Sequence, residues 1–483
     1  MKLKRDRQRR GWAFLWTRGI RALGILTSSA LIFAMICCSG VASAIEPDEA
    51  ARIARQYLAA DDDDEKGALY EKLAKYDGEI EPVLAKLRSH TFDAVNPGYL
   101  PKEHFTTPEL LAEYPDDLLY YLVPKSYRAD RPTGLIVFMH GGGNASSRKA
   151  PRYYMNFIDE DDGDSSQLGD LFDATGMVAV GPSAPWDEES SYRWCLPEAD
   201  DYLSAVIAEC KRRFNIDADR VFLVGHSMGG FGAYHHIHRQ PDRFAGVVVS
   251  SGSWQLGYWP TIRGTKLCII QGVEDAEKDE RWHYTDVAYA RETDKILAKL
   301  KLDYEYHEHP HGHWVGYSRP YIEKFFESTK HLRRDPYYPH IVLASPVGYS
   351  RYYSSEVKHN RWLTLDEAEE GKLTYDLLLC DDDVEFDEWK LTHERRRRDG
   401  AAIDATNRGD NMIAVYTKNV KRFTVWLHPK MVDIRKPVTV FVDGEQKFRG
   451  KVTPTLATAL ESYERRSDWG LIYPIKIELT TDP

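Results

Sequence analysis

The chain has 483 residues, of which 42% are hydrophobic and 12% aromatic, and its formal net charge is −11 at pH 7. One core seldom grows beyond about 250 to 300 residues, so this length predicts two or three globular domains. The acidic balance argues against nucleic acid or an anionic membrane surface as a partner.

The first 44 residues have the pattern of an export signal. A basic stretch precedes an apolar run over residues 25–38, and the small residues Ala42 and Ala44 follow it. We expect cleavage after Ala44 and a periplasmic or extracellular mature protein, with an uncleaved N-terminal anchor as the alternative. Removing the eight Lys/Arg and one Asp of this signal peptide changes the net charge from −11 to −18.

Cysteine usage does not indicate a disulfide scaffold. Four cysteines remain after residue 44, namely Cys195, Cys210, Cys268 and Cys380. That number is low for a chain of this length, although one bridge is compatible with an oxidising compartment.

Residues 45–118 predict a helical N-terminal region and a linker. Apolar residues recur at helical spacing over 46–90, where we expect the acidic run Asp61–Glu65 to form a solvated turn between helices. The proline-containing stretch 91–118 is expected to be a connecting segment.

Residues 119–332 predict an α/β domain. Short apolar runs such as "LIVFM", "RVFLV" and "KLCII" alternate with helical stretches, which is typical of a mostly parallel sheet with helices on both faces. Residues 336–483 differ, because strand-like runs dominate there and "VDGEQ" has the Asp-Gly signature of a hairpin. We therefore expect a β-rich C-terminal domain, with one helix at "TLATALESYERR".

The stretch "GHSMGG" at 225–230 follows the apolar run "RVFLV". In a G-x-S-x-G pattern, the glycines allow a sharp turn from strand to helix that exposes the serine hydroxyl. Ser227 is therefore a candidate nucleophile, although the same glycines would also suit close packing of a strand on a helix.

The segment "HGGG" at 140–143 ends an earlier apolar run. Its glycines would let backbone amides approach a developing oxyanion, and the amide of Met228, next after Ser227, would be the second donor. An ordinary glycine-rich strand exit is the plainer interpretation.

A carboxylate and a histidine complete the constellation. "QGVED" follows an apolar run and offers Asp275, with Glu274 and then Asp279 as alternatives. "HEHPHGHW" offers His313 just before the predicted closing helix, with His311 as the alternative. The order Ser227, Asp275, His313, each after a predicted strand, indicates a nucleophile, an orienting acid and a base.

The histidine-rich tract could also bind a metal ion. It lacks zinc-type Cys/His spacing and the helical presentation of H-E-x-x-H. We therefore expect neither a metal site nor a cofactor.

With these motifs in place, residues 119–332 resemble the α/β-hydrolase superfamily. They look most like the secreted polyhydroxybutyrate-depolymerase and feruloyl-esterase-like group and the esterase-like members of the prolyl-oligopeptidase clan. The resemblance implies Ser227 as nucleophile, Asp275 as acid and His313 as base, and oxyanion amides from Met228 and from Gly142 or Gly143. It does not extend to the N-terminal helices or the C-terminal β region.

The sequence therefore predicts a secreted serine hydrolase that cleaves carboxylic esters, with an acylated carbohydrate, an aryl ester or a polyester as the substrate. A serine peptidase of the prolyl-oligopeptidase clan is the alternative, and a non-catalytic binding protein is a weaker one. Trp362, Trp426 and Trp469 could contact polysaccharide, but tryptophans of a β domain more often belong to its core. Trp186, Trp254 and Trp259 are candidates for lining the acyl pocket. The oligomeric state stays open.

Overall fold

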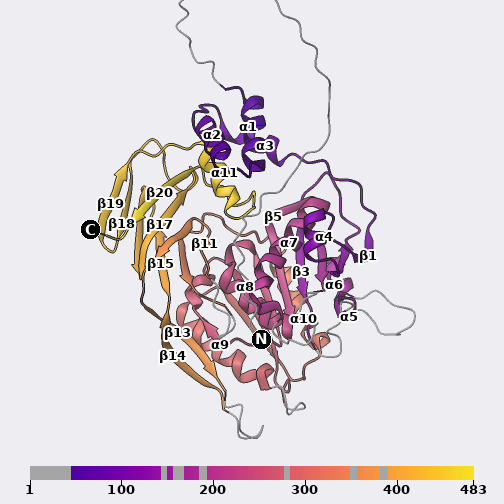
Figure 1. The fold of residues 1–483 in the computed structure, drawn as a ribbon. Helices are drawn as coiled ribbons and strands as arrows, with labels where there is room; N and C mark the ends of the chain where they lie inside the picture. The colour runs from indigo at the N-terminus through magenta and orange to yellow at the C-terminus, as the bar shows by residue number, and fades with distance from the viewer. Residues whose placement is uncertain are drawn as a thin grey trace, which may run out of the picture. The chain divides into compact units, whose positions relative to one another are not determined.

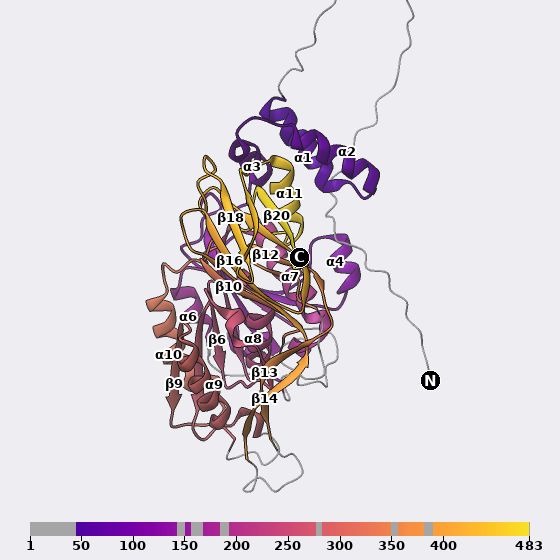
Figure 2. The ribbon, with the colours of Figure 1, turned by 90° about the vertical axis from the view of Figure 1, so that its left-hand side faces the viewer.

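A computed structural model describes residues 45–142, 150–155, 168–183, 193–276, 283–348, 356–380 and 390–482 (Figures 1 and 2). The described residues form two compact units. The helical unit consists of 45–90 and 453–476, and the main unit of the described residues of 91–452 and 477–482. None of the helices found in these ranges combines the length and apolar character needed to cross a membrane.

A mostly parallel sheet forms the centre of the main unit (Figure 1). Its strand order is β1-β2-β4-β3-β5-β6-β8-β9, in which the pairs made by β1 and β2 are antiparallel and all the others are parallel. The strands are β1 Gly98–Glu103, β2 Leu119–Val123, β3 Thr133–Met139, β4 Val178–Pro182, β5 Ile216–His226, β6 Gly246–Ser250, β8 Lys266–Gly272 and β9 Tyr304–His309. The predicted α/β class is therefore confirmed.

Helices cover both faces of this sheet because successive strand residues, which point to opposite faces, are apolar on both. In β3, Leu135 and Val137 join a cluster with residues of α7, α8 and α9, whereas Ile136 and Phe138 join a cluster with residues of α5, α6 and α10. The helices are α4 Pro108–Glu113, α5 Ala150–Met155, α6 Gly169–Ala174, α7 Pro197–Arg213, α8 Met228–Arg239, α9 Val287–Leu300 and α10 Val315–Ser328.

The β-rich C-terminal region consists of three smaller sheets with the orders β10-β15-β16-β18-β19, β11-β12-β17-β20 and β14-β13-β7. The predicted hairpin is present, since Asp443 and Gly444 join β18 to β19 with positive φ angles of 52° and 88°. The strands are β7 Leu256–Gly257, β10 His340–Ser345, β11 His359–Asn360, β12 Leu363–Ala368, β13 Lys372–Leu379, β14 Thr392–Asp399, β15 Ala401–Asn407, β16 Met412–Lys418, β17 Val420–Leu427, β18 Val438–Val442, β19 Glu445–Gly450 and β20 Ile475–Thr480.

The β-rich region and the α/β region share backbone and side-chain bonds within the main unit. Strand β7, which follows β6 in the chain, pairs with β13 through Leu256 and Leu377. The buried Arg361 guanidinium donates to the carbonyls of Arg263 and Gly264, at 3.2 and 2.7 Å. The structure therefore keeps together two regions that were predicted to divide near residue 332.

The helical unit contains α1 Pro47–Ala59, α2 Asp63–Ala74, α3 Ile80–Arg88 and α11 Leu456–Glu464. The apolar face of α11, including Leu456 and Leu460, is buried with residues of the three N-terminal helices. Tyr57 donates to Glu464 at 2.6 Å across the same cluster. The helix predicted at the end of the β region therefore exists, but it packs with the N-terminal helices because its apolar face completes their core.

Two expectations for residues 45–118 are corrected. The run Asp61–Glu65 is not simply a turn, because Asp62 caps α2 by accepting from the Glu65 amide at 2.8 Å. Acidic side chains in the first turn, here Asp63 and Asp64, are stabilised by the positive end of the helix. The segment 91–118 is more than a connection, since it contributes β1 and α4.

Most of the singled-out tryptophans are core residues. Trp362 and Trp426 are buried, and Trp469 stacks on Tyr463 with ring centres 3.9 Å apart. Trp254 and Trp259 are fully buried and contact each other edge to face. The buried side chains therefore offer no surface to a polysaccharide or an acyl chain; they are Trp254, Trp259, Trp362 and Trp426. Trp186 lies outside the described residues.

Cys195, Cys210 and Cys268 are buried free thiols, so none of these three forms the single bridge that the sequence left open.

Glycines let β5 run directly into α8. A Cβ at Gly225 would lie 2.0 Å from the Gly229 carbonyl oxygen, and a Cβ at Gly229 would lie 2.0 Å from the Met139 carbonyl oxygen. Both distances are far below van der Waals contact, so neither position admits a side chain. The helix is thereby held against the ends of β5 and β3.

Buried histidines predict that the protein loses stability in mild acid. Burial lowers the pKa of His140 and of His238 to about 4, from 6.5. Between pH 6.5 and 4 the unfolded chain therefore binds protons that the folded chain does not, and the free energy of unfolding falls as the pH falls. We expect a loss of about 2 kcal/mol for each histidine between pH 7 and pH 5.

Urea unfolding of the wild type and of His238→Gln at pH 7 and pH 5 measures this effect. The variant lacks the His238 ring, so its stability should depend less on pH by about 2 kcal/mol. Equal pH dependence in the two proteins would contradict the prediction.

Candidate active site

Ser227 lies at the turn between β5 and α8, at the carboxyl edge of the parallel sheet. It precedes the first residue of α8 and has φ 54° and ψ −118°, a conformation that residues with a side chain rarely adopt. Its amide donates to the Ser250 carbonyl of β6 at 2.9 Å, which holds the strained residue in place. The partial positive charge of the N-terminus of α8 favours negative charge near the Ser227 hydroxyl.

Two hydrogen bonds connect Ser227, His313 and Asp275. The Ser227 Oγ lies 2.8 Å from His313 Nε2, and His313 Nδ1 lies 2.6 Å from Asp275 Oδ1. The His313 side chain is 43% exposed, whereas the Asp275 side chain is fully buried. The three predicted residues are therefore brought together, with the carboxylate inside and the imidazole open to solvent.

Neighbouring groups fix the Asp275 carboxylate. Gln271, from the end of β8, donates through Nε2 to Asp275 Oδ2 at 2.9 Å, so both carboxylate oxygens have partners. The loops after β8 and β9 also pair through their backbones, since Val273 donates to the His309 carbonyl at 2.8 Å and Glu274 to the His311 carbonyl at 3.3 Å. This pairing brings the loop that carries Asp275 beside the loop that carries His313.

The alternative residues lie elsewhere. The His311 ring stacks on Tyr317 with centres 4.3 Å apart, and His307 approaches Glu305 at 3.5 Å. Glu274 takes part in the pairing of the loops after β8 and β9 through its backbone amide, whereas Asp275 makes the hydrogen bond to His313. Asp279 lies outside the described residues.

The glycine-rich loop after β3 approaches the same turn. A Cβ placed on Gly142 would be 3.6 Å from the Met228 sulfur, so Gly142 and Met228, the two predicted oxyanion donors, are neighbours. A Cβ on Gly141 would come 2.5 Å from the Tyr154 hydroxyl and 3.2 Å from the Ser227 Cβ. Gly143 lies outside the described residues.

Tyr154 and His226 belong to the surroundings of Ser227 and were not predicted. Tyr154 follows no recognisable motif, and burial raises the pKa of its hydroxyl to about 12. His226 is the variable residue before Ser227 in the G-x-S-x-G pattern, which is the one signal that could have singled it out. Its ring lies 4.9 Å from the His313 ring, and burial lowers its pKa well below 6.5.

Buried hydroxyls and rings continue from His226 beneath the site. His226 Nδ1 lies 3.0 Å from Ser250 Oγ, which donates to Ser318 Oγ at 2.9 Å, and Ser318 in turn approaches His309 Nε2 at 3.4 Å. This chain connects β5, β6, α10 and β9. These contacts therefore connect the buried residues beneath Ser227 to α10, the helix that follows His313.

Exposed aromatic rings lie next to His313 in the chain. Trp314 is 54% exposed and Tyr317 is 38% exposed, and their rings meet edge to face at 5.1 Å. Large exposed aromatic side chains are uncommon and often belong to binding surfaces.

Two groups of side chains in the described residues have donor atoms close enough together to bind a metal ion. They are Asp200 with His235 and His236, and Cys268 with Glu305 and His307. Neither group contains a residue of the Ser227 site.

Part of this chain is similar to a curated protein. One curated relative is a bifunctional acetylxylan esterase/xylanase from Neocallimastix patriciarum, 23% identical over 157 residues, which are 31% of this chain and 22% of that protein. The chain therefore matches less than a quarter of the length of that relative.

Solved structures are also similar. A thermostable esterase is 20% identical with a TM-score of 0.37, covering 49% of this chain and 63% of that one. The feruloyl esterase module from Clostridium thermocellum, solved as an S954A mutant with sinapinate, is 16% identical with a TM-score of 0.35, covering 49% of this chain and 90% of that one.

The model of the alpha/beta hydrolase family matches residues 136–409, which is more than half of the chain. This range begins within β3 and contains the parallel strands β4, β5, β6, β8 and β9, the turn at Ser227 and the loops that carry Asp275 and His313. The protein belongs to the alpha/beta hydrolase family.

Proposed function

We propose that this protein hydrolyses carboxylic esters through an acyl-enzyme formed on Ser227. The observation that carries the proposal is the continuous hydrogen bonding from Ser227 Oγ through His313 to Asp275, at 2.8 and 2.6 Å. Both distances lie in the range in which a base can take a proton from a nucleophile and a carboxylate can orient that base.

The chemistry follows from the roles of these groups. Ser227 Oγ attacks the acyl carbonyl carbon while its proton passes to His313 Nε2, and the buried Asp275 carboxylate stabilises the imidazolium that forms. The bond to the alcohol then breaks, and the alcohol leaves with the proton from His313. Water, deprotonated by the same imidazole, attacks the acyl-enzyme and releases the acid.

The negative charge that develops on the carbonyl oxygen requires hydrogen-bond donors, which lie on the side of Ser227 away from His313 in this proposal. The neighbouring Gly142 and Met228 supply the amides in this proposal, aided by the N-terminus of α8. Donors that are already in place need no reorganisation as the charge develops, which is why such sites lower the barrier.

Among the predicted ester classes, the surface beside His313 favours substrates that carry rings. The exposed Trp314 and Tyr317 rings offer flat apolar faces to a sugar or an aryl group. The acetylxylan esterase/xylanase named among the relatives is consistent with an acylated carbohydrate.

Ser227→Ala should remove ester hydrolysis, because it deletes the hydroxyl that forms the acyl bond in this proposal. We expect turnover of short acyl esters to fall by about 10⁴-fold or more, and covalent labelling by a fluorophosphonate probe to disappear. Ser328→Ala, which removes a hydroxyl bound to the Phe325 carbonyl in α10, is the control and should behave like the wild type. Persistent labelling of Ser227→Ala would contradict the proposal, and faster turnover of aminoacyl amides than of esters would favour a peptidase.

Paired substitutions test the acid and the base. Asp275→Asn should lower kcat by about 10³- to 10⁴-fold, because the amide stabilises the wrong tautomer of His313, and His313→Gln should cost at least as much. Glu274→Gln and His311→Gln are the matched controls, one residue and two residues away, and should retain turnover close to that of the wild type. A large loss in either control with little loss in its partner would reassign the role.

Export by residues 1–44 is part of the proposal. The basic stretch, the apolar run and the small residues before Ile45 support removal of this segment after Ala44. N-terminal sequencing of the protein recovered from the periplasm or medium of an expressing bacterium should begin at Ile45. Recovery only in the membrane fraction, with residues 1–44 retained, would instead indicate an anchor.

A further inference from the structure

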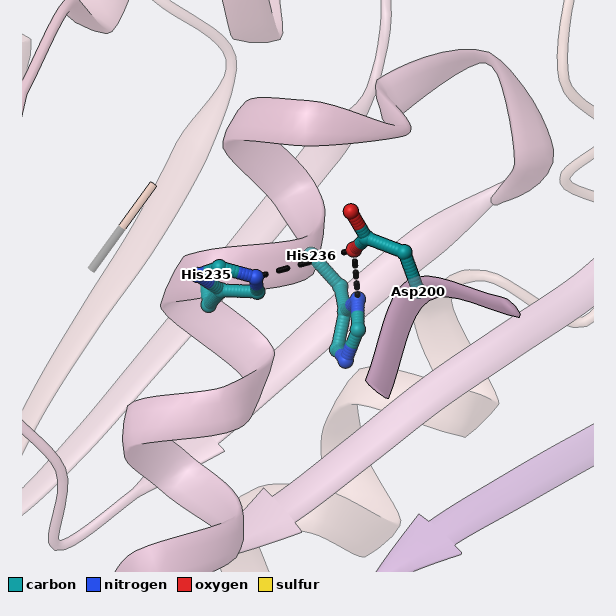
Figure 3. A group of neighbouring side chains, drawn as sticks. All are labelled: Asp200, His235 and His236. Carbon is teal, nitrogen blue, oxygen red and sulfur yellow. Dashed lines mark ion pairs between the residues drawn. The ribbon is translucent and has the colours of Figure 1, made fainter. Parts of the chain in front are cut away.

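A cluster of buried donor atoms lies between α7 and α8, outside the Ser227 site (Figure 3). Asp200 comes from α7, and the consecutive residues His235 and His236 come from α8. Neighbouring residues of a helix point about 100° apart, and the Asp200 carboxylate approaches both rings. The histidine side chains are 3% and 0% exposed, and the Asp200 side chain is 16% exposed.

The spacing of the donor atoms matches that of metal ligands. Asp200 Oδ1 lies 3.3 Å from His236 Nδ1 and 3.6 Å from His235 Nε2, and the three atoms are all within 4.8 Å of one another. Four ligands at about 2.0 to 2.2 Å from a tetrahedral Zn²⁺ ion are separated by about 3.4 Å. One ion can therefore contact these atoms with little movement of the side chains.

Hydrogen bonding inside the described structure leaves part of the cluster unexplained. Both nitrogens of the fully buried His236 ring, and Asp200 Oδ1, have no hydrogen-bond partner there. Buried polar atoms are nearly always paired with protein, water or an ion, because leaving them bare costs free energy. Of these atoms, His236 Nδ1 and Asp200 Oδ1 point toward each other, and a shared ion would lie beside both.

Arg239 holds the carboxylate from its other side. Its guanidinium donates to Asp200 Oδ2 at 2.6 Å and to the Val347 carbonyl at 2.7 Å, which leaves Oδ1 turned toward the rings. Carboxylate ligands of metal sites are commonly oriented by such a partner. The Arg239 charge also opposes a nearby cation, so the competing arrangement is an ion pair of Asp200 and Arg239 with two neutral histidines.

We propose that Asp200, His235 and His236 bind one Zn²⁺ ion that joins α7 to α8. The two imidazoles and one carboxylate are the donor set that zinc accepts, and water takes the fourth position. His235 and His236 lie eight and nine residues after Ser227, or about 12 to 14 Å along the helix, so the ion does not contact the reacting atoms. It fixes the helix whose first turn carries the nucleophile, and its presence is independent of which substrate the enzyme cleaves.

Metal analysis of the untagged full chain tests the proposal. After chelation and dialysis, the protein should take up one equivalent of Zn²⁺, and its Tm should rise by about 3 to 5 °C at a hundredfold excess over Kd. Co²⁺ in place of Zn²⁺ should give the intense visible absorption of a tetrahedral site. No uptake, or uptake without a change in Tm, would overturn the proposal.

Two variants separate a metal site from a structural cluster. His236→Gln should lose the bound equivalent, the Co²⁺ absorption and the Tm rise, whereas His238→Gln, two residues along the same buried helix, should keep all three. Equal zinc binding by both variants would overturn the proposal, since the ion would then lie elsewhere, for instance at His307–His311. If His236→Gln does not fold, X-ray absorption of the zinc-loaded wild type decides: two imidazoles and two oxygens at about 2.0 Å support the site, and six-coordinate zinc overturns it.

Discussion

The contact between the end of β5 and the first turn of α8 is the constraint on which the site depends. With no side chains at Gly225 and Gly229, the helix backbone lies against β5 and the Met139 carbonyl, and Ser227 takes up its strained conformation at the junction. The register of the parallel strands determines where the loops after β8 and β9 begin. It aligns His226 with Ser250, Ser250 with Ile270, and Gly272 with His309, so the loops after β8 and β9 begin level with Ser227.

Electrostatics beneath the site follow from burial. A histidine protonates during acyl transfer, and a second positive ring beside it would oppose that step. His226 lies 4.9 Å from His313, but its burial lowers its pKa so far that the ring is neutral. His226 can therefore connect β5 to the buried Ser250 and Ser318 without adding charge beside His313.

The parts of the fold that could be predicted are those in which local pattern and packing agree. Continuous apolar runs marked most of the parallel strands, and Ser227, Asp275 and His313 could be located because each follows a predicted strand. Strand β14 could not be predicted, because its sequence "THERRRRD" has no apolar alternation. The strand forms through its pairing with β13.

Contacts between helices that are far apart in the sequence could not be predicted either. Helix α11 packs with α1 to α3, from which it is separated by most of the sequence. Tyr154 near Ser227, and the group of Asp200, His235 and His236, also arise only when separate helices meet. Zinc motifs with short fixed spacing cannot reveal donors that come from two helices, which is why the sequence predicted no metal site.

The pairing of β7 with β13 has a consequence for the order in which the chain acquires its structure. Leu256 follows β6, the strand beside the one that leads to Ser227, yet its partner Leu377 lies more than a hundred residues later. The segment after β6 therefore lacks its neighbouring strand until β13 has been synthesised. A chain cut near residue 332 before folding would hold β7 and β13 on different fragments, so their pairing would then require two polypeptides to associate.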